Sequence, residues 1–455
     1  MIEAIDDLGL TVLSRILWHA FLSSRVDRLP REEFLKHQRE RLQQAIAHGY
    51  SKTKFWRNWL DRSGVRPDDI MEIEDLRRIR VCTKYDLLAQ PLEDRMADDP
   101  KNCIVRSSSG TTGGPMKSYY SKSYYDYLAG YYIQGHYLRI RGILGIGPFD
   151  KLMRITHGNP SDVRSISRRT KSLGFTSRLV GPLHDYFARN VTLGDDIDEI
   201  LPEIRKFKPD FIKSTPSYLR LLAHSVSSEG IEEIRPKALM TGGEVLDEPT
   251  RKYLQEVFGC KTYQGYSASE IGKIGFECER RMGLHVSDSV IVEILKDGSP
   301  TLPGESGNIV VTCLLNDAMP MIRYDLGDVG SWANSPCSCG RNTPLLESVD
   351  GRREDHLTFS PNRIISPKSL MSMLHRDMSL PPSQLVQETD DVCRLRVFAK
   401  VKSKGISNLL DEVQAFLGSQ TKVELSLEPS QELRVKFRPV ISYKNLRDKR
   451  WTLVN

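Results

Sequence analysis

The sequence predicts an α/β fold, with a large domain of layered α/β sheets over residues 1–350 and a small α+β domain over residues 351–455. Two observations support this prediction. Short apolar runs of the strand type alternate with helical patterns between about residues 135 and 320, and strand-type alternation around a single amphipathic helix follows residue 351. At 455 residues, 39% of them hydrophobic, the chain is long enough for more than one core.

The N-terminal region, residues 1–100, is predicted to be largely helical. Leu35, Leu42 and Ile46 recur at helical spacing, which indicates a face packed against the rest of the large domain. Aromatic residues gather in segments 51–56 and 119–125. They could line a pocket for a planar or aromatic substrate, although aromatic side chains on helices more often belong to a core.

Three strand-type segments in the middle of the chain each end in glycine or polar residues. They lie at 208–213, 238–240 and 261–270, and Pro216 marks the first turn of a helix after the first of them. Repeated units of strand, turn and helix place ligands at the carboxyl ends of the strands. We therefore expect the functional site at that edge of the sheet.

The segment 107–117 is rich in glycine and hydroxyl side chains. Glycine lets the backbone approach a ligand, and hydroxyl and amide groups can surround phosphate oxygens, so the segment is predicted to be a phosphate-binding loop. It lacks the glycine spacing of a Walker loop. A flexible serine- and glycine-rich linker is the alternative interpretation.

Composition narrows the function further. The net charge is +6 with acidic and basic residues interspersed, which argues against a nucleic-acid-binding stripe. We expect a cytoplasmic protein, because no apolar run reaches about 18 residues and the N-terminus lacks the basic region of a signal peptide. Eight cysteines spread over a long chain indicate reduced thiols or metal ligands instead of a disulfide scaffold.

Five ordered motifs resemble those of the adenylate-forming (AMP-binding) superfamily. The likeness is strongest to the branch that contains phenylacetate-CoA ligase, CapK-like proteins and coenzyme F390 synthetase, and it covers nearly the whole chain. The motifs are 108–113, 242–244, 266–270, 323–328 and 351–355.

The resemblance implies an ATP-dependent, AMP-forming ligase. Such an enzyme activates a small carboxylic acid, here expected to be aryl or similar, as acyl-AMP with release of pyrophosphate. It then transfers the acyl group to CoA, a carrier-protein thiol or an amine, and it works as a monomer or homodimer. Two alternatives stay open: an adenylyltransferase that leaves AMP on the acceptor, and a nucleotide-binding protein without catalysis.

The resemblance also assigns roles to residues. The phosphates of ATP would be held by Ser109, Gly110, Thr111, Thr112 and Gly113, with Thr112 counted among the catalytic residues. Glu270 would be a catalytic residue and the Mg²⁺ ligand, since hard oxygen donors beside phosphates suit that ion. Around the nucleoside, the expected residues are Gly243 and Glu244 near the base, Tyr266 stacked on adenine with Ser267 beside it, Asp328 on the ribose and Arg352 near the ribose or phosphates.

Each of these residues also has a purely structural interpretation. Glu270 could complement a helix dipole, Tyr266 could be a core aromatic, and Asp328 could be a turn residue. The sequence departs from the family pattern at Ser267, where glycine is usual, and Lys117 is given no catalytic role because Met116 separates it from Pro115.

The C-terminal domain is predicted from strands at 393–401, 421–427 and 433–441 and an amphipathic helix at 406–417 with Leu409, Val413, Phe416 and Leu417 on its apolar face. By resemblance, this domain is mobile about a hinge at Glu354 or Asp355 and delivers the catalytic Lys436. A compact ammonium on a flexible stem suits that role. Val435 stands where a glycine usually precedes the lysine, and a solvated lysine on a strand is the alternative.

Four residues have the composition of a structural zinc site: Cys278, His285, Cys337 and Cys339. Proteins of the resembled branch carry a metal site of this kind, while buried free thiols are the alternative. Cys313 is a possible substitute ligand, and Cys82, Cys103, Cys260 and Cys393 are expected in the core.

Overall fold

The structure is a computed structural model that describes residues 18–19, 21–22, 25–107, 116–133, 150–157, 188–193, 197–360, 363–399, 401–429 and 438–447. It confirms the predicted α/β class: a mixed twelve-stranded sheet is covered by helices, and a smaller four-stranded sheet follows it in the chain. No helix in these ranges combines the length and the apolar character needed to cross a membrane.

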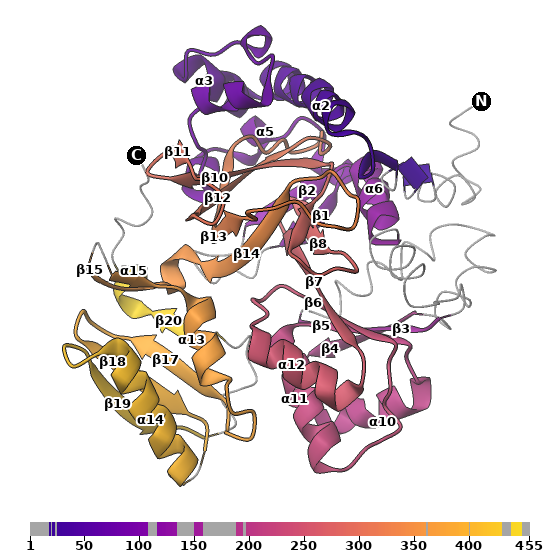
Figure 1. The fold of residues 1–455 in the computed structure, drawn as a ribbon. Coiled ribbons are helices and arrows are strands. Elements are labelled where there is room, and N and C mark those ends of the chain that lie inside the picture. The colour runs from indigo at the N-terminus through magenta and orange to yellow at the C-terminus, as the bar shows by residue number, and fades with distance from the viewer. Residues whose placement is uncertain are drawn as a thin grey trace.

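The N-terminal part is helical, as predicted, and forms the indigo and purple cap of Figure 1. Phe34, Leu42 and Ile46 of the first long helix are buried, but Leu35 is 37% exposed, so its expected place on the buried face is wrong. The buried row follows the spacing of four residues from Phe34, and Leu35 falls beside it. The elements of this part are α2 (Arg31–Lys52), α3 (Lys54–Arg62), α4 (Lys84–Leu88), α5 (Leu92–Arg95), β1 (Ile104–Ser107), β2 (Lys117–Tyr120) and α6 (Lys122–Ile133).

One half of the large sheet is parallel and carries the predicted strand, turn and helix units. Its order is β4-β3-β5-β6-β7, and helices α10, α11 and α12 pack on one face through a shared apolar core (Figure 1). The elements are β3 (Leu152–His157), β4 (Ala188–Leu193), α10 (Ile197–Phe207), β5 (Phe211–Ser214), α11 (Pro216–Ser228), β6 (Ala238–Gly242), α12 (Glu248–Phe258) and β7 (Lys261–Ala268).

Local sequence explains the limits of these helices. Pro216 occupies the first turn of α11, where its missing N–H costs nothing. Asp247 caps α12 by accepting from the Thr250 amide, and Gly259 ends the helix in the left-handed conformation at φ 65°. Two strands therefore end next to helix starts at the same sheet edge.

The other half of the sheet is antiparallel and continues from β7 in the order β8-β9-β14-β13-β12-β10-β11. Its apolar residues share one core with α2, α3 and α6, so the aromatic residues Trp56, Tyr120 and Tyr124 belong to a core. The strands are β8 (Gly272–Glu277), β9 (Leu284–Val286), β10 (Val290–Lys296), β11 (Ser299–Pro300), β12 (Ser306–Cys313), β13 (Tyr324–Trp332) and β14 (Leu345–Arg352).

A third core lies in the C-terminal unit, shown in gold in Figure 1, and its buried residues run from Leu357 to Val440. Its sheet has the order β19-β18-β17-β20. Phe416 is 48% exposed, which contradicts its predicted place on the apolar face of α14, whereas Leu409, Val413 and Leu417 are buried. The elements are β15 (Leu357–Ser360), β16 (Arg363–Ile365), α13 (Pro367–Leu374), β17 (Ser383–Gln387), β18 (Val392–Val397), α14 (Lys404–Leu417), β19 (Lys422–Leu427), β20 (Val440–Ser442) and α15 (Tyr443–Arg447).

Candidate nucleotide site

A cavity of about 160 Å³ lies at the carboxyl ends of β6 and β7, between the large sheet and the C-terminal unit. Residues from motifs far apart in the chain meet on its walls, as the resemblance implies. Those predicted from the sequence are Gly243, Glu244, Tyr266, Ser267, Asp328, Arg352 and Asp355. We refer to this space as the nucleotide cavity, and the roles given to its residues stay predictions.

Tyr266, Asp328 and Arg352 form one polar network. The Tyr266 hydroxyl donates to Asp328 Oδ2 at 2.7 Å, and Arg352 Nε lies 3.3 Å from Asp328 Oδ1. The Asp328 carboxylate raises the pKa of Arg352, and burial raises the pKa of Tyr266, so the phenol stays protonated and the guanidinium charged. A carboxylate has about four lone-pair sites, which leaves Asp328 able to accept from further hydroxyls.

The turn after β6 brings backbone close to the cavity. Gly243 has φ 82°, a conformation that a side chain would strain. Glu244 follows it, and its Oε2 accepts from the Ser217 amide at 3.1 Å in the first turn of α11. Glu244 thus complements the positive end of α11 as well as lining the cavity.

Glu270 lies in the turn between β7 and β8, half-buried. Burial raises the pKa of this carboxyl, while the Arg352 and Lys84 charges oppose the rise. The alternative interpretation of Glu270 as a helix-terminal carboxylate is wrong, because the residue lies between two strands. A carboxylate oxygen is the kind of donor that a divalent cation held next to phosphate prefers.

The predicted phosphate residues, Ser109 to Gly113, lie outside the described residues. Their flanks are described: β1 and β2 pair antiparallel, with Ser107 opposite Lys117. The hydroxyl of Tyr120, at the end of β2, donates to the Ser269 carbonyl at 2.6 Å. The hairpin that carries the predicted loop is therefore attached to the turn that carries Glu270.

The predicted hinge residues form the short 3₁₀ turn Arg353–Asp355 directly after β14. Asp355 accepts from Arg438 Nε at 3.1 Å, and Arg438 also lines the nucleotide cavity. Lys436 lies outside the described residues, two positions before Arg438 in the sequence. The contact joins the beginning of the chain segment 438–442 to the predicted hinge.

Several cavity residues were not foreseen from the sequence, among them Arg220 and His375. His375 Nδ1 lies 2.9 Å from Asp247 Oδ2 and 3.2 Å from Thr250 Oγ1, so a residue after α13 contacts the capped start of α12. Burial and the Arg220 charge lower the pKa of His375, which favours the neutral imidazole. The sequence holds no local signal for these residues, because the fold alone brings them together.

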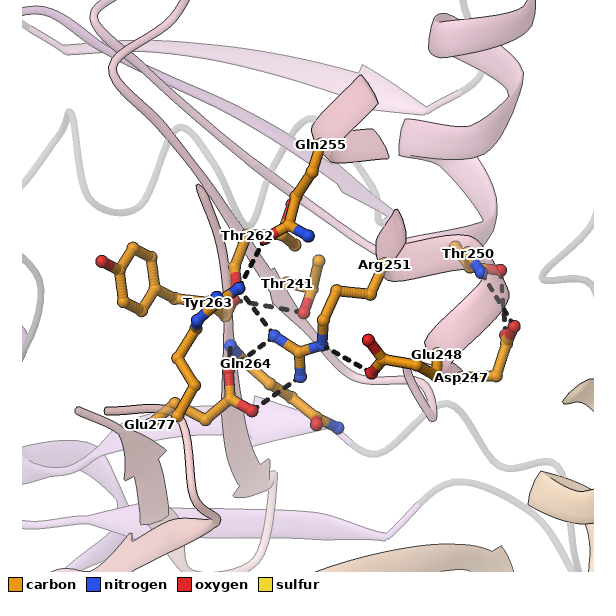
Figure 2. Close-up of polar contacts among 11 residues, drawn as sticks. Thr241, Asp247, Glu248, Thr250, Arg251, Gln255, Thr262, Tyr263, Gln264 and Glu277 are labelled. Carbon is orange, nitrogen blue, oxygen red and sulfur yellow. Dashed lines mark hydrogen bonds and ion pairs between the residues drawn. The ribbon is translucent and has the colours of Figure 1, made fainter. Parts of the chain in front are cut away.

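Figure 2 shows how α12 is attached to β7 and β8 beside the cavity. Arg251 donates through Nη2 to Glu277 Oε1 at 2.6 Å and through Nη1 to Glu277 Oε2 at 3.0 Å, and Glu277 Oε2 also accepts from the Gln264 amide at 2.7 Å. Gln264 lies in the wall of the nucleotide cavity and of a second, larger cavity of about 440 Å³. The Arg251–Glu277 pair therefore fixes the strand that carries Tyr266.

The four residues predicted to bind zinc come together in the structure. Their ligand atoms all lie within 4.8 Å of one another. Cys278 Sγ is 3.5 Å from Cys337 Sγ, and Cys339 Sγ is 3.3 Å from His285 Nε2. These separations are near the roughly 3.5–3.8 Å expected between ligands of tetrahedral zinc.

The surroundings of this cluster also suit a metal. Thr343 Oγ1 lies 3.0 Å from His285 Nδ1 and orients Nε2 toward the three thiols. Cys313, the predicted substitute, contacts the Tyr124 hydroxyl and is outside the cluster. Of the cysteines expected in the core, Cys82 and Cys393 are buried, whereas Cys103 and Cys260 are only partly buried.

Comparison with known proteins gives consistent relatives. Over 344 residues, 73% of each chain, the sequence is 30% identical to the phenylacetate-coenzyme A ligase of Thermus thermophilus. It is 28% identical to the enzyme of the same name from Escherichia coli over 77% of this chain and 75% of that one. A crystal structure of 2-hydroxyisobutyryl-CoA ligase in the postadenylation state shares the fold, with a TM-score of 0.73, 20% identity and 94% of both chains covered. No protein-family model matches the chain.

Proposed function

The chain belongs to the phenylacetate-coenzyme A ligase family of adenylate-forming enzymes, and from this membership we propose that it activates a carboxylic acid as acyl-AMP and transfers the acyl group to coenzyme A. The first step joins the carboxylate to the α-phosphate of ATP and releases pyrophosphate. In the second step the thiol displaces AMP, so that one thioester is formed for each ATP consumed.

The observation that carries this proposal is the convergence in the nucleotide cavity. Tyr266, Asp328 and Arg352 come from three separate strands, and they offer a ring, an acceptor and a cation. A purine nucleoside with ribose hydroxyls and phosphates requires these three kinds of group. In our proposal Tyr266 stacks on the base, Asp328 accepts from the ribose and Arg352 faces the phosphates.

The proposal gives the remaining chemistry to Glu270, to the segment 109–113 and to Lys436. Mg²⁺ held by Glu270 would neutralise charge on the phosphates and align them for in-line displacement. The hydroxyl and amide groups of Ser109 to Gly113 would hold the β and γ phosphates, and Lys436 would stabilise charge on the carboxylate and α-phosphate. The C-terminal unit would turn about Glu354 and Asp355 between the two steps.

We also propose that Cys278, His285, Cys337 and Cys339 bind one structural zinc ion. All four positions of a tetrahedral ion would be occupied by protein ligands, which leaves no open position for chemistry. The site would join the Cys278–His285 loop to the segment around Cys337, and so stabilise the paired strands β8, β9 and β14.

A pyrophosphate-release assay over a panel of carboxylic acids, with and without CoA, tests the function. We expect acid-dependent release of pyrophosphate, followed by a CoA thioester detectable by mass spectrometry. Glu270→Gln is the matched inactive control, because it keeps the side chain's shape and removes its charge. If the acyl group is transferred only to an amine or a carrier thiol, that acceptor replaces CoA in the proposal. AMP left on the acceptor would indicate an adenylyltransferase. ATP binding without release of pyrophosphate would indicate a non-catalytic protein.

A further inference from the structure

Three basic side chains lie on the same face of the large sheet. Arg154 on β3 is the register partner of Lys213 on β5, and Lys213 is the partner of Met240 on β6. Met240 is in turn the partner of Tyr263 on β7. Partners in neighbouring parallel strands project to the same side, so Arg154 and Lys213 share the face of Met240 and Tyr263.

The third basic residue, Lys273, reaches this face from β8. A β-carbon on Gly265 would collide with the Lys273 ammonium, so the lysine crosses over the backbone of Gly265. Gly265 follows Tyr263 by two positions in β7 and thus presents the same face. Lys273 is only 4% exposed, and Gly265 itself lines the nucleotide cavity. Through Lys273 beside Gly265, this basic face therefore adjoins one wall of the nucleotide cavity.

The three side chains act on one another electrostatically. Burial lowers the pKa of Lys213 well below its ordinary value, and the charges of Lys273 and Arg154 lower it further. Apolar residues lie on the same face, among them Leu152, Phe211 and Met240. In such surroundings an anion close to Lys213 would favour the charged form of this lysine and would be strongly attracted, because the local dielectric constant is low.

We propose that this face, defined by Arg154, Lys213 and Lys273, binds a second anionic group of the acid substrate. The inference rests on the proposed function, in which one carboxylate reacts at the α-phosphate. A single reacting carboxylate needs the cations of the phosphate site, and the three basic side chains of this face would hold another charge. The substrate class is thus a carboxylic acid with a second anionic group, such as a dicarboxylic acid.

Matched pairs of acids test this inference by pyrophosphate release with ATP and Mg²⁺. The pairs are phenylacetate with its carboxy-substituted derivatives, and pentanoate with glutarate. We expect kcat/KM to be about 10- to 100-fold higher for the acid with the second carboxylate, the scale of charge-assisted hydrogen bonds. Lys273→Met should remove this preference and leave the monocarboxylic acid within about threefold. Lys261→Met is the control, because Lys261 is exposed at the start of β7, the strand that carries Gly265.

The outcomes separate the inference from the function it rests on. Preference for the monocarboxylic acid, or an unchanged preference in Lys273→Met, would overturn the inference while leaving the ligase proposal intact. If neither acid of any pair is turned over, the ligase proposal fails. The inference is then tested by titration calorimetry, which measures binding of the diacid directly. Binding of the diacid to the parent protein and its loss in Lys273→Met would support it, and equal or absent binding would overturn it. Should Lys273→Met not fold, as judged by circular dichroism, Lys213→Met takes its place with the same expectation.

Discussion

Replacing Asp328 with asparagine tests the centre of the nucleotide cavity. In the parent protein the carboxylate accepts from the Tyr266 hydroxyl at 2.7 Å and lies 3.3 Å from Arg352 Nε. Asparagine keeps the shape but carries no charge, and one of its two polar atoms can only donate. The asparagine side chain cannot accept hydrogen bonds from the tyrosine, the arginine and a ribose hydroxyl at the same time.

The size of the effect follows from the kind of contact that is lost. A hydrogen bond to a charged group contributes about 1.5–3 kcal/mol, which corresponds to about 10- to 150-fold in an equilibrium constant. Because the ribose is held equally in the ground and transition states, we expect Asp328→Asn to raise the KM for ATP by this factor and change kcat little. The assay is initial pyrophosphate release against ATP concentration, at a saturating acid concentration.

A matched control guards against a general effect on the fold. Asp350 on β14 has the same exposed fraction as Asp328, 9%, but does not line the nucleotide cavity. Asp350→Asn should therefore leave the KM for ATP unchanged. A KM for ATP within threefold of the parent value in Asp328→Asn, with circular dichroism showing a folded protein, would refute the assignment of this carboxylate to the nucleotide.

Three further predictions concern the metals and the mobile lysine. Glu270→Gln should lower the rate of adenylation at least about 100-fold, and a near-parental rate in this variant would remove Glu270 from the site. Because burial raises the pKa of Glu270, the Mg²⁺-dependent activity of the parent protein should fall on acidification at a higher pH than it would with an exposed glutamate. Lys436→Ala should slow formation of acyl-AMP by about 10²- to 10³-fold and spare acyl transfer from synthetic acyl-AMP, measured by thioester formation, and equal damage to both steps would make the lysine structural. The purified protein should contain about one zinc per chain by elemental analysis and lose thermal stability with a strong chelator; protein purified without chelator and found free of zinc would contradict the Cys₃His site.

The sequence alone predicted the features that depend on short local runs. Strand and helix periodicity indicated the α/β class, and Pro216 marked the start of α11 because proline fixes a local backbone angle. Short motifs that resemble those of the family pointed to Gly243, Tyr266 and Asp328, and all three line the nucleotide cavity, where their roles stay predictions. The expected zinc ligands were chosen by residue type together with the family resemblance, which left Cys313 as a possible substitute.

Exposure of individual residues was predicted less well. Leu35 and Phe416 were expected on buried faces and are exposed, because the position of the buried row on a helix depends on the surface it packs against. Glu270 lies between two strands, where burial raises the pKa of its carboxyl and the charge of Arg352 from β14 opposes the rise. Helical spacing fixes which residues share a face but not which face meets the core.

Only the tertiary structure decided how distant segments meet. The contact of His375 with Asp247 and that of Arg438 with Asp355 join residues more than 80 positions apart, and no local sequence pattern predicts either contact. The basic face next to Gly265 depends on strand register, which makes Arg154 the neighbour of Lys213 and brings Lys273 over the same surface. Sequence patterns report the conformation of a segment, whereas the electrostatic field at a site is the sum over strands that pairing alone brings together.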